Sequence, residues 1–83
     1  MIAKIRKAMQ QHDDLVVEFC YRDFKGVETR RVVSPIRFVG RNRFLGLCLC
    51  REAPRQFYLD RCRDLALKPA SSFVMPVPMT TVG

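Results

Sequence analysis

With 83 residues, the chain is long enough for one domain and too short for two that each bury a core. Hydrophobic residues make up 48% of it, which is ordinary for a globular protein. No apolar run approaches the roughly 20 residues that cross a membrane, and residues 1–7 lack the apolar segment of a secretory signal. We therefore expect one cytoplasmic domain that is not embedded in a membrane.

The formal net charge of +7 belongs to the middle of the chain. Residues 1–29 hold five basic and five acidic side chains, and residues 64–83 hold one of each, so both ends are neutral. Residues 30–63 carry nine arginines against two acidic side chains. Because arginine binds phosphate bidentately and stacks on bases, this segment predicts nucleic acid or a nucleotide as the partner.

The four cysteines, Cys20, Cys48, Cys50 and Cys62, form no Cys-x-x-Cys pair, and the single histidine lies far from them in the sequence. This spacing does not favour a structural zinc site or a disulfide-stapled secreted domain. We expect reduced, mostly buried cysteines and no metal or cofactor. We also expect no enzymatic activity, the alternative being a reactive thiol at Cys50 or Cys62 if nearby arginines lower its pKa.

The apolar residues recur with the period of one helix and then with the period of strands. The helix is predicted at Ile2–Gln11. Five strands are predicted at Leu15–Tyr21, Val27–Val33, Arg43–Cys50, Gln56–Asp60 and Cys62–Leu67, with a short extended piece at Ile36–Val39. Pro35 marks a strand end, an edge or a bend, because it cannot donate a ladder hydrogen bond.

Two hairpins follow from this order. The first two strands pair with each other, and Arg43–Cys50 pairs with Gln56–Asp60 around a turn at Arg51–Pro54. Arg43–Cys50 is apolar on both faces, which predicts a central strand. Residues 70–83 read as an extended tail that is either free or docked on its own domain or a neighbouring subunit.

One helix and five short strands in so few residues bury a core most readily when the sheet curls into a small barrel. We predict a mainly β fold with one N-terminal helix, in an SH3-like or Sm-like five-stranded barrel. The domain would span residues 1–69, followed by the tail. An OB-like barrel and a flat sheet with one helix are the alternatives.

The sequence resembles the WYL domain family, found in many bacterial transcriptional regulators. The likeness covers about Ile2–Pro69 and rests on the joint spacing of four segments. These are Leu-Val-Val-Glu-Phe-Cys-Tyr at 15–21, Lys-Gly-Val-Glu-Thr-Arg-Arg-Val-Val-Ser-Pro at 25–35, Arg-Phe-Leu at 43–45 and Arg-Gln-Phe-Tyr-Leu-Asp-Arg at 55–61.

Residue by residue, Tyr21 matches the tyrosine that ends the family's first strand, and Arg31 with Pro35 matches its Arg-x-Val-x-Pro. The three letters that name the family fall on residues 43–45, so its tryptophan is replaced by Arg43 and its tyrosine by Phe44. In the family's Arg-x-Phe-Arg-x-x-Arg run, the outer arginines match Arg55 and Arg61, and the inner arginine is replaced by Tyr58. The resemblance implies an Sm-like barrel that binds nucleic acid or a nucleotide-like effector through basic and aromatic side chains.

The candidate ligand-binding residues are Tyr21, Arg31, Arg43, Arg55, Tyr58 and Arg61. Arginines interleaved with exposed rings are typical of a surface for single-stranded nucleic acid. Alternation places Phe57 in the core and Tyr58 outside. The structural alternative pairs Arg61 with Asp60 or Asp64, and Arg31 with Glu18 or Glu28.

Two functions remain open at this point. The first is a ligand-sensing regulatory module that binds single-stranded nucleic acid or a nucleotide. The second is a protein-interaction or oligomerisation module that uses the basic face, the sheet edges and the apolar tail. WYL domains commonly follow a DNA-binding helix-turn-helix, and these residues do not build one. The chain would therefore act through a partner or be one domain of a longer regulator.

Overall fold

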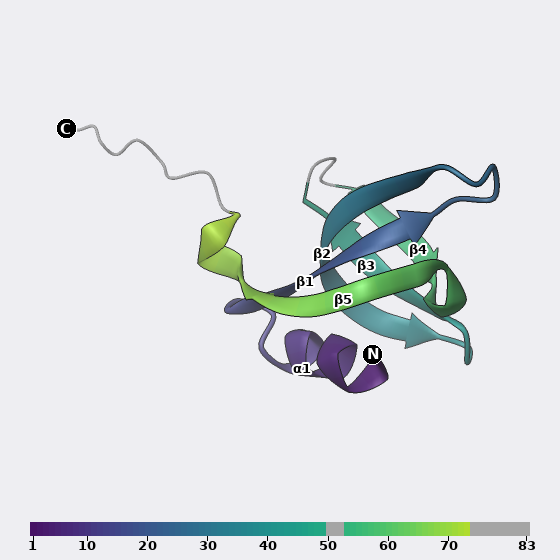
Figure 1. Ribbon diagram of the computed structural model, residues 1–83. Helices are drawn as coiled ribbons and strands as arrows, with labels where there is room; N and C mark the ends of the chain where they lie inside the picture. The colour runs from purple at the N-terminus through teal and green to yellow at the C-terminus, as the bar shows by residue number, and fades with distance from the viewer. Residues whose placement is uncertain (50–52, 74–83) are drawn as a thin grey trace.

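The computed structural model of the chain describes residues 1–49 and 53–73 (Figure 1). One helix precedes five strands, and every pair of neighbouring strands is antiparallel. The sheet order is β4-β3-β2-β1-β5. The elements are α1 (Ile2–Gln10), β1 (Leu15–Arg22), β2 (Glu28–Val39), β3 (Arg43–Cys48), β4 (Ala53–Tyr58) and β5 (Cys62–Pro69), with 3-10 helices η1 (Leu59–Arg61) and η2 (Ala70–Ser72).

The sheet is curled but open, so the mainly β fold with one N-terminal helix is confirmed and the closed barrel is not observed. In the described part of the chain, β4 and β5 are the two edges and do not pair. Even so, the ring centroids of Phe19 on β1 and Phe57 on β4 lie 5.5 Å apart. Two strands separate β1 from β4, and a flat sheet would hold them about 14 Å apart. The sheet therefore folds over its own aromatic core.

The core consists of aromatic and aliphatic side chains from the sheet and from α1. Phe19, Phe44 and Phe57 are at most 2% exposed, and the rings of Phe44 and Phe57 stack with centroids 5.5 Å apart. From α1, Ile5 and Ala8 are fully buried in the same cluster. The predicted core position of Phe57 and the exposed position of Tyr58, at 41%, are both confirmed.

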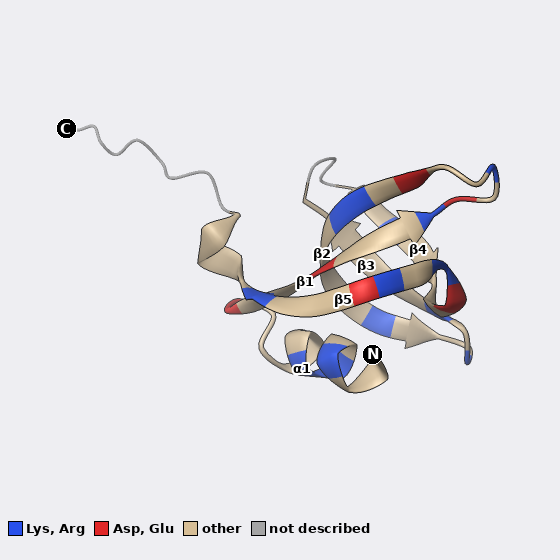
Figure 2. Ribbon diagram, viewed as in Figure 1, with Lys and Arg blue, Asp and Glu red and all other residues tan. Residues whose placement is uncertain are grey.

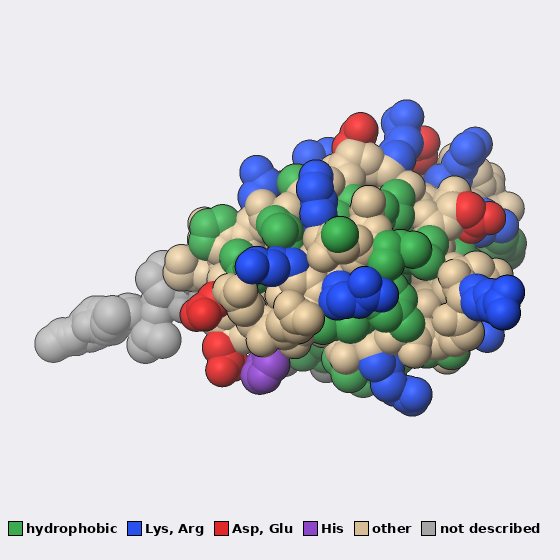
Figure 3. Space-filling model, turned by 90° about the horizontal axis from the view of Figure 1, so that it is seen from below, with side chains coloured by type: hydrophobic (Ala, Val, Ile, Leu, Met, Phe, Trp, Pro, Cys, Tyr) green, Lys and Arg blue, Asp and Glu red, His purple; other side chains and the backbone are tan. Residues whose placement is uncertain are grey.

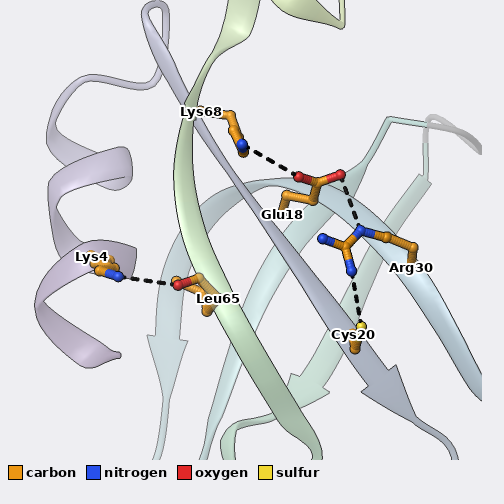
Figure 4. A network of polar contacts seen from close by, with 6 residues as sticks. All are labelled: Lys4, Glu18, Cys20, Arg30, Leu65 and Lys68. Atoms are coloured by element: carbon orange, nitrogen blue, oxygen red, sulfur yellow. Dashed lines mark hydrogen bonds and ion pairs between the residues drawn. The ribbon is translucent and has the colours of Figure 1, made fainter.

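Helix α1 lies beneath the sheet beside β5 (Figure 1). Its Lys4 Nζ donates a hydrogen bond to the backbone oxygen of Leu65, 3.2 Å away, which satisfies a carbonyl on this edge strand (Figure 4). On the face of the molecule that carries α1, lysine and arginine side chains are scattered around exposed apolar side chains and do not form one patch (Figure 3). Within residues 1–49 and 53–73, no helix is long and apolar enough to cross a membrane.

Strand β2 is longer than the sequence predicts, because it continues without a break past Pro35 to Val39. Its pairing with β3 shifts register between Pro35 and Arg37. Ile36 sits in that irregularity and is 50% exposed. Pro35 thus marks neither a strand end nor an edge strand, and it adjoins an irregularity in the pairing of β2 with β3.

The second hairpin also differs from its prediction. β4 begins at Ala53 instead of Gln56, and Pro54 is tolerated there because β4 is an edge strand. Leu59 and Asp60 belong to η1 rather than to the strand. β3 lies inside the sheet, as predicted, and ends at Cys48. Residues 50–52, the last residue of the predicted strand and the first two of the predicted turn, lie outside the described residues.

β5 runs two residues further than predicted, to Pro69. The predicted tail starts with η2 and a turn at Phe73. Residues 74–83, on which the docking expectation rests, lie outside the described residues.

Gly46 on β3 is required by close packing, which gives a test of the core. A Cβ at this position would collide with Cγ1 of the buried Val33 on β2, and would lie 3.4 Å from both the Phe44 ring and the Ser34 oxygen. We expect Gly46→Ala to lower the free energy of unfolding by about 1–3 kcal/mol, the usual cost of overpacking. Urea denaturation followed by circular dichroism measures it.

Val33→Ala provides the control, because it removes the methyl group that an added Cβ would meet. In that background, Gly46→Ala should cost clearly less than in the wild-type chain. Equal costs in the two backgrounds would contradict the packing argument.

Candidate functional site

An open hollow of about 570 Å³ lies where the ends of β1 and β4 meet η1. Four of the six predicted ligand-binding residues line it: Tyr21 from β1, Arg55 and Tyr58 from β4, and Arg61 from η1. The other lining residues are Asp23, Phe24, Asn42, Gln56, Phe57 and Asp60. Residues 40 positions apart in the chain thus share one concave surface because the sheet curls.

Tyr21 connects the core to this hollow. Its ring meets the Phe57 ring edge-on, with centroids 5.2 Å apart. Its hydroxyl accepts a hydrogen bond from the backbone N–H of Tyr58 at 3.1 Å. Tyr21 therefore fixes the position of Tyr58 as well as facing the hollow.

Arg55 and Arg61 bring positive charge without an acidic partner in the described residues. Neither forms an ion pair there, so the predicted pairing of Arg61 with Asp60 or Asp64 is not found. The Arg61 guanidinium donates instead to the backbone oxygen of Arg22, 3.4 Å away. Both guanidinium groups therefore remain available to an anion.

Arg43 lies beside the hollow and contacts Tyr58. The two residues face each other in the β3–β4 ladder, and the guanidinium carbon of Arg43 is 5.8 Å from the Tyr58 ring centroid. The corresponding distance from Arg61 is 6.0 Å. Arg43 also donates to Gln56 Oε1 at 2.9 Å. The exposed Tyr58 ring therefore lies within cation–π range of two guanidinium groups.

Arg31 is not part of this arrangement. It faces Phe19 in the β1–β2 ladder, does not line this hollow, and donates through Nε to Thr29 Oγ1 at 2.9 Å. Its predicted ion pairs are not formed, because both candidate carboxylates bind other cations. Glu28 accepts from Arg63 at 2.6 Å, which also raises the pKa of that guanidinium.

Glu18, the other candidate partner of Arg31, lies on the opposite face of β1 from the core. It lies 3.4 Å from Arg30 Nε and 4.0 Å from Lys68 Nζ, and Arg30 donates further to Cys20 Sγ at 3.1 Å (Figure 4). Several of the nine arginines thus bind other side chains of the domain. The basic segment does not form a single basic face.

Sequence reasoning missed Phe24, which lines the hollow and is 82% exposed. It sits in the β1–β2 turn, where Asp23 Oδ1 accepts from the backbone N–H groups of Lys25 and Val27 at 2.9 and 3.0 Å. The sequence did contain a signal for this residue, because an aromatic side chain in a tight polar turn cannot reach the core. Acidic and basic residues alternate at this hairpin tip and in the turn before β5 (Figure 2).

Cys20 and Cys62 form no disulfide within the described residues, and no group of metal-ligating side chains occurs in the described ranges. Burial, assisted by the negative charge of Asp60, raises the pKa of Cys62 to about 12. This shift is opposite in direction to the lowered pKa that activation by arginines would give Cys62. Cys50 lies outside the described residues.

Cys62 should accordingly react slowly with thiol reagents. At pH 7.5 only a very small fraction of Cys62 is thiolate, which slows alkylation. A thiolate of high pKa is also more nucleophilic, which offsets part of this loss. We therefore expect Cys62 to be alkylated roughly 30-fold more slowly than a free model thiol. Iodoacetamide labelling followed by peptide mass spectrometry separates the four cysteines. The half-exposed Cys20 is the internal control, and a rate at Cys62 that equals or exceeds the rate of the model thiol would contradict the assignment.

Comparison with known proteins places this geometry in a family. The family model for the WYL domain matches residues 1–67. Among solved structures, proteasome accessory factor B/C (PafBC) of Arthrobacter aurescens superposes with a TM-score of 0.65 at 22% sequence identity. The alignment covers 99% of this chain but 13% of PafBC. A search of the curated proteins finds no match. Since the family model covers most of the chain and the fold agrees, this chain belongs to the WYL domain family.

Proposed function

We propose that this chain is a ligand-sensing regulatory module that binds single-stranded nucleic acid or a nucleotide in the hollow between β1, β4 and η1. WYL domains occur in many bacterial transcriptional regulators, so the proposed role is in transcription regulation in the cytoplasm. The curled sheet behind the hollow is, on this proposal, an open form of the SH3-like or Sm-like architecture.

The observation that carries the proposal is the combination of unpaired arginines with exposed rings in one concave surface. Arg55 and Arg61 have no acidic partner among the described residues, and Tyr58 and Phe24 expose their rings next to them. Proteins that bind single strands use this combination, with cations on the backbone phosphates and aromatic faces under the bases. The volume of the hollow, about 570 Å³, is in the range of small-molecule sites.

The output of such a module depends on what it is attached to. The chain spans 13% of the length of PafBC. We infer that a partner, or further domains of a longer regulator, converts ligand binding into a change in transcription. No catalytic step is required.

Binding of a fluorescent single-stranded oligonucleotide over a salt series tests this function. If Arg43, Arg55 and Arg61 each contact a phosphate, log affinity should fall against log salt with a slope near −2, at roughly 0.7 per contact. Arg55→Gln should weaken binding for all sequences and make the slope shallower by about 0.7. Arg30→Gln is the matched control, since Arg30 pairs with Glu18 on the other face and should leave binding unchanged.

Two results would overturn the proposal. Absence of binding even at low salt would favour the protein-interaction alternative, for which the edge of β4, paired with no further strand in the described part of the chain, offers the surface. Loss of the folded circular dichroism spectrum in Arg55→Gln would assign that arginine to structure instead.

A further inference from the structure

A second hollow adjoins the first and shares part of its wall. It has a volume of about 390 Å³ and includes Arg22, Glu28 and Arg63 in its lining. Asp23, Phe24, Asp60 and Arg61 line both hollows. The boundary between them therefore carries two carboxylates, an arginine and an exposed ring.

These carboxylates change what the surface selects. In the larger hollow, Arg55 and Arg61 are matched in number by Asp23 and Asp60, so its formal charge is balanced. A surface that only tracked phosphates would gain nothing from acidic groups, which repel the backbone. A balanced surface fits a ligand that brings both an anion and hydrogen-bond donors.

Asp60 is the carboxylate that is available for such donors. Asp23 already accepts two backbone hydrogen bonds, and Glu28 binds Arg63 at 2.6 Å. Asp60 is exposed and, within the described residues, has no hydrogen-bond or ion-pair partner. Both of its oxygens can therefore accept from a ligand.

The chemistry of the bases distinguishes which ligand suits a free carboxylate. A carboxylate accepts but cannot donate, and its two oxygens match two parallel donors. Guanine has two such donors, N1–H and the N2 amino group, side by side on its Watson–Crick edge. Adenine and cytosine place an acceptor beside their amino group, and thymine and uracil have a single N–H between two carbonyls.

We propose that the Asp60 carboxylate recognises the Watson–Crick edge of a guanine base. The base would stack on an aromatic ring of the same wall, Phe24 or Tyr58, while Arg55 and Arg61 hold the neighbouring phosphates. This inference rests on the proposed function and adds base selectivity to it. The guanine can belong to a single strand or to a free nucleotide.

The test compares short oligothymidines that carry one central guanine, inosine or no substitution. Wild-type protein should bind the guanine strand about tenfold more tightly than plain oligothymidine, a usual effect of a bidentate base contact. Inosine lacks the N2 amino group and should lose most of this gain. Asp60→Asn replaces one acceptor by a donor and should abolish the preference, so that this variant binds the guanine strand no more tightly than it binds plain oligothymidine.

Asp64→Asn is the matched control because it removes the same charge four residues away. Asp64 is exposed, lines neither hollow and has a φ of 55°, which asparagine adopts as readily as aspartate. This variant should keep the guanine preference. Competition by guanosine and adenosine monophosphates then identifies the source: displacement by the guanosine form alone supports a free nucleotide, and displacement only by a strand supports nucleic acid.

Equal wild-type affinity for all three strands would overturn the guanine assignment while leaving the proposed function intact. So would a guanine preference that survives in Asp60→Asn. If the wild-type protein binds no strand and neither nucleotide at low salt, the proposed function fails and this inference fails with it.

Discussion

The packing of Phe19, Phe44 and Phe57 is the interaction on which the rest of the structure depends. These rings come from β1, β3 and β4, and their centroids lie 5.5 to 6.0 Å apart. Bringing them together forces the sheet to curl, because β1 and β4 are separated by two strands. The curl lets the Tyr21 hydroxyl reach the backbone of Tyr58. The hollow is thus a consequence of burying the aromatic core.

Two of the residues that depart from the family pattern are neighbours in the sheet. Arg43 stands where the family has tryptophan, and Tyr58 stands where it has arginine. The ladder places them opposite each other on β3 and β4, and they make a cation–π contact of 5.8 Å. Tyr58 therefore contributes an aromatic ring where the family pattern has a cation, and Arg43 contributes a cation where that pattern has a ring.

The clustering of arginines in the sequence does not produce a single cluster of positive charge on the surface. The arginine-rich segment is distributed over both faces of the sheet, and Arg30 and Arg63 are bound by glutamates. Around the two hollows, aspartates stand among the arginines. On the function proposed above, a ligand would be selected by complementary groups at defined positions rather than by a uniform positive field, so the identity of a base would matter.

The sequence by itself determined the helix, five strands, both hairpins, the core position of Phe57 and the exposure of Tyr58, because these follow from local periodicity and turn residues. It also identified four residues of the hollow, since the family motif fixes their spacing. Only the tertiary structure decided that the sheet stays open and that Arg31 lies outside the hollow. It also decided that Phe24 and Asp60 line the hollow. These features depend on how far the sheet curls and on which carboxylate each arginine reaches, and both are set by contacts between residues distant in the chain.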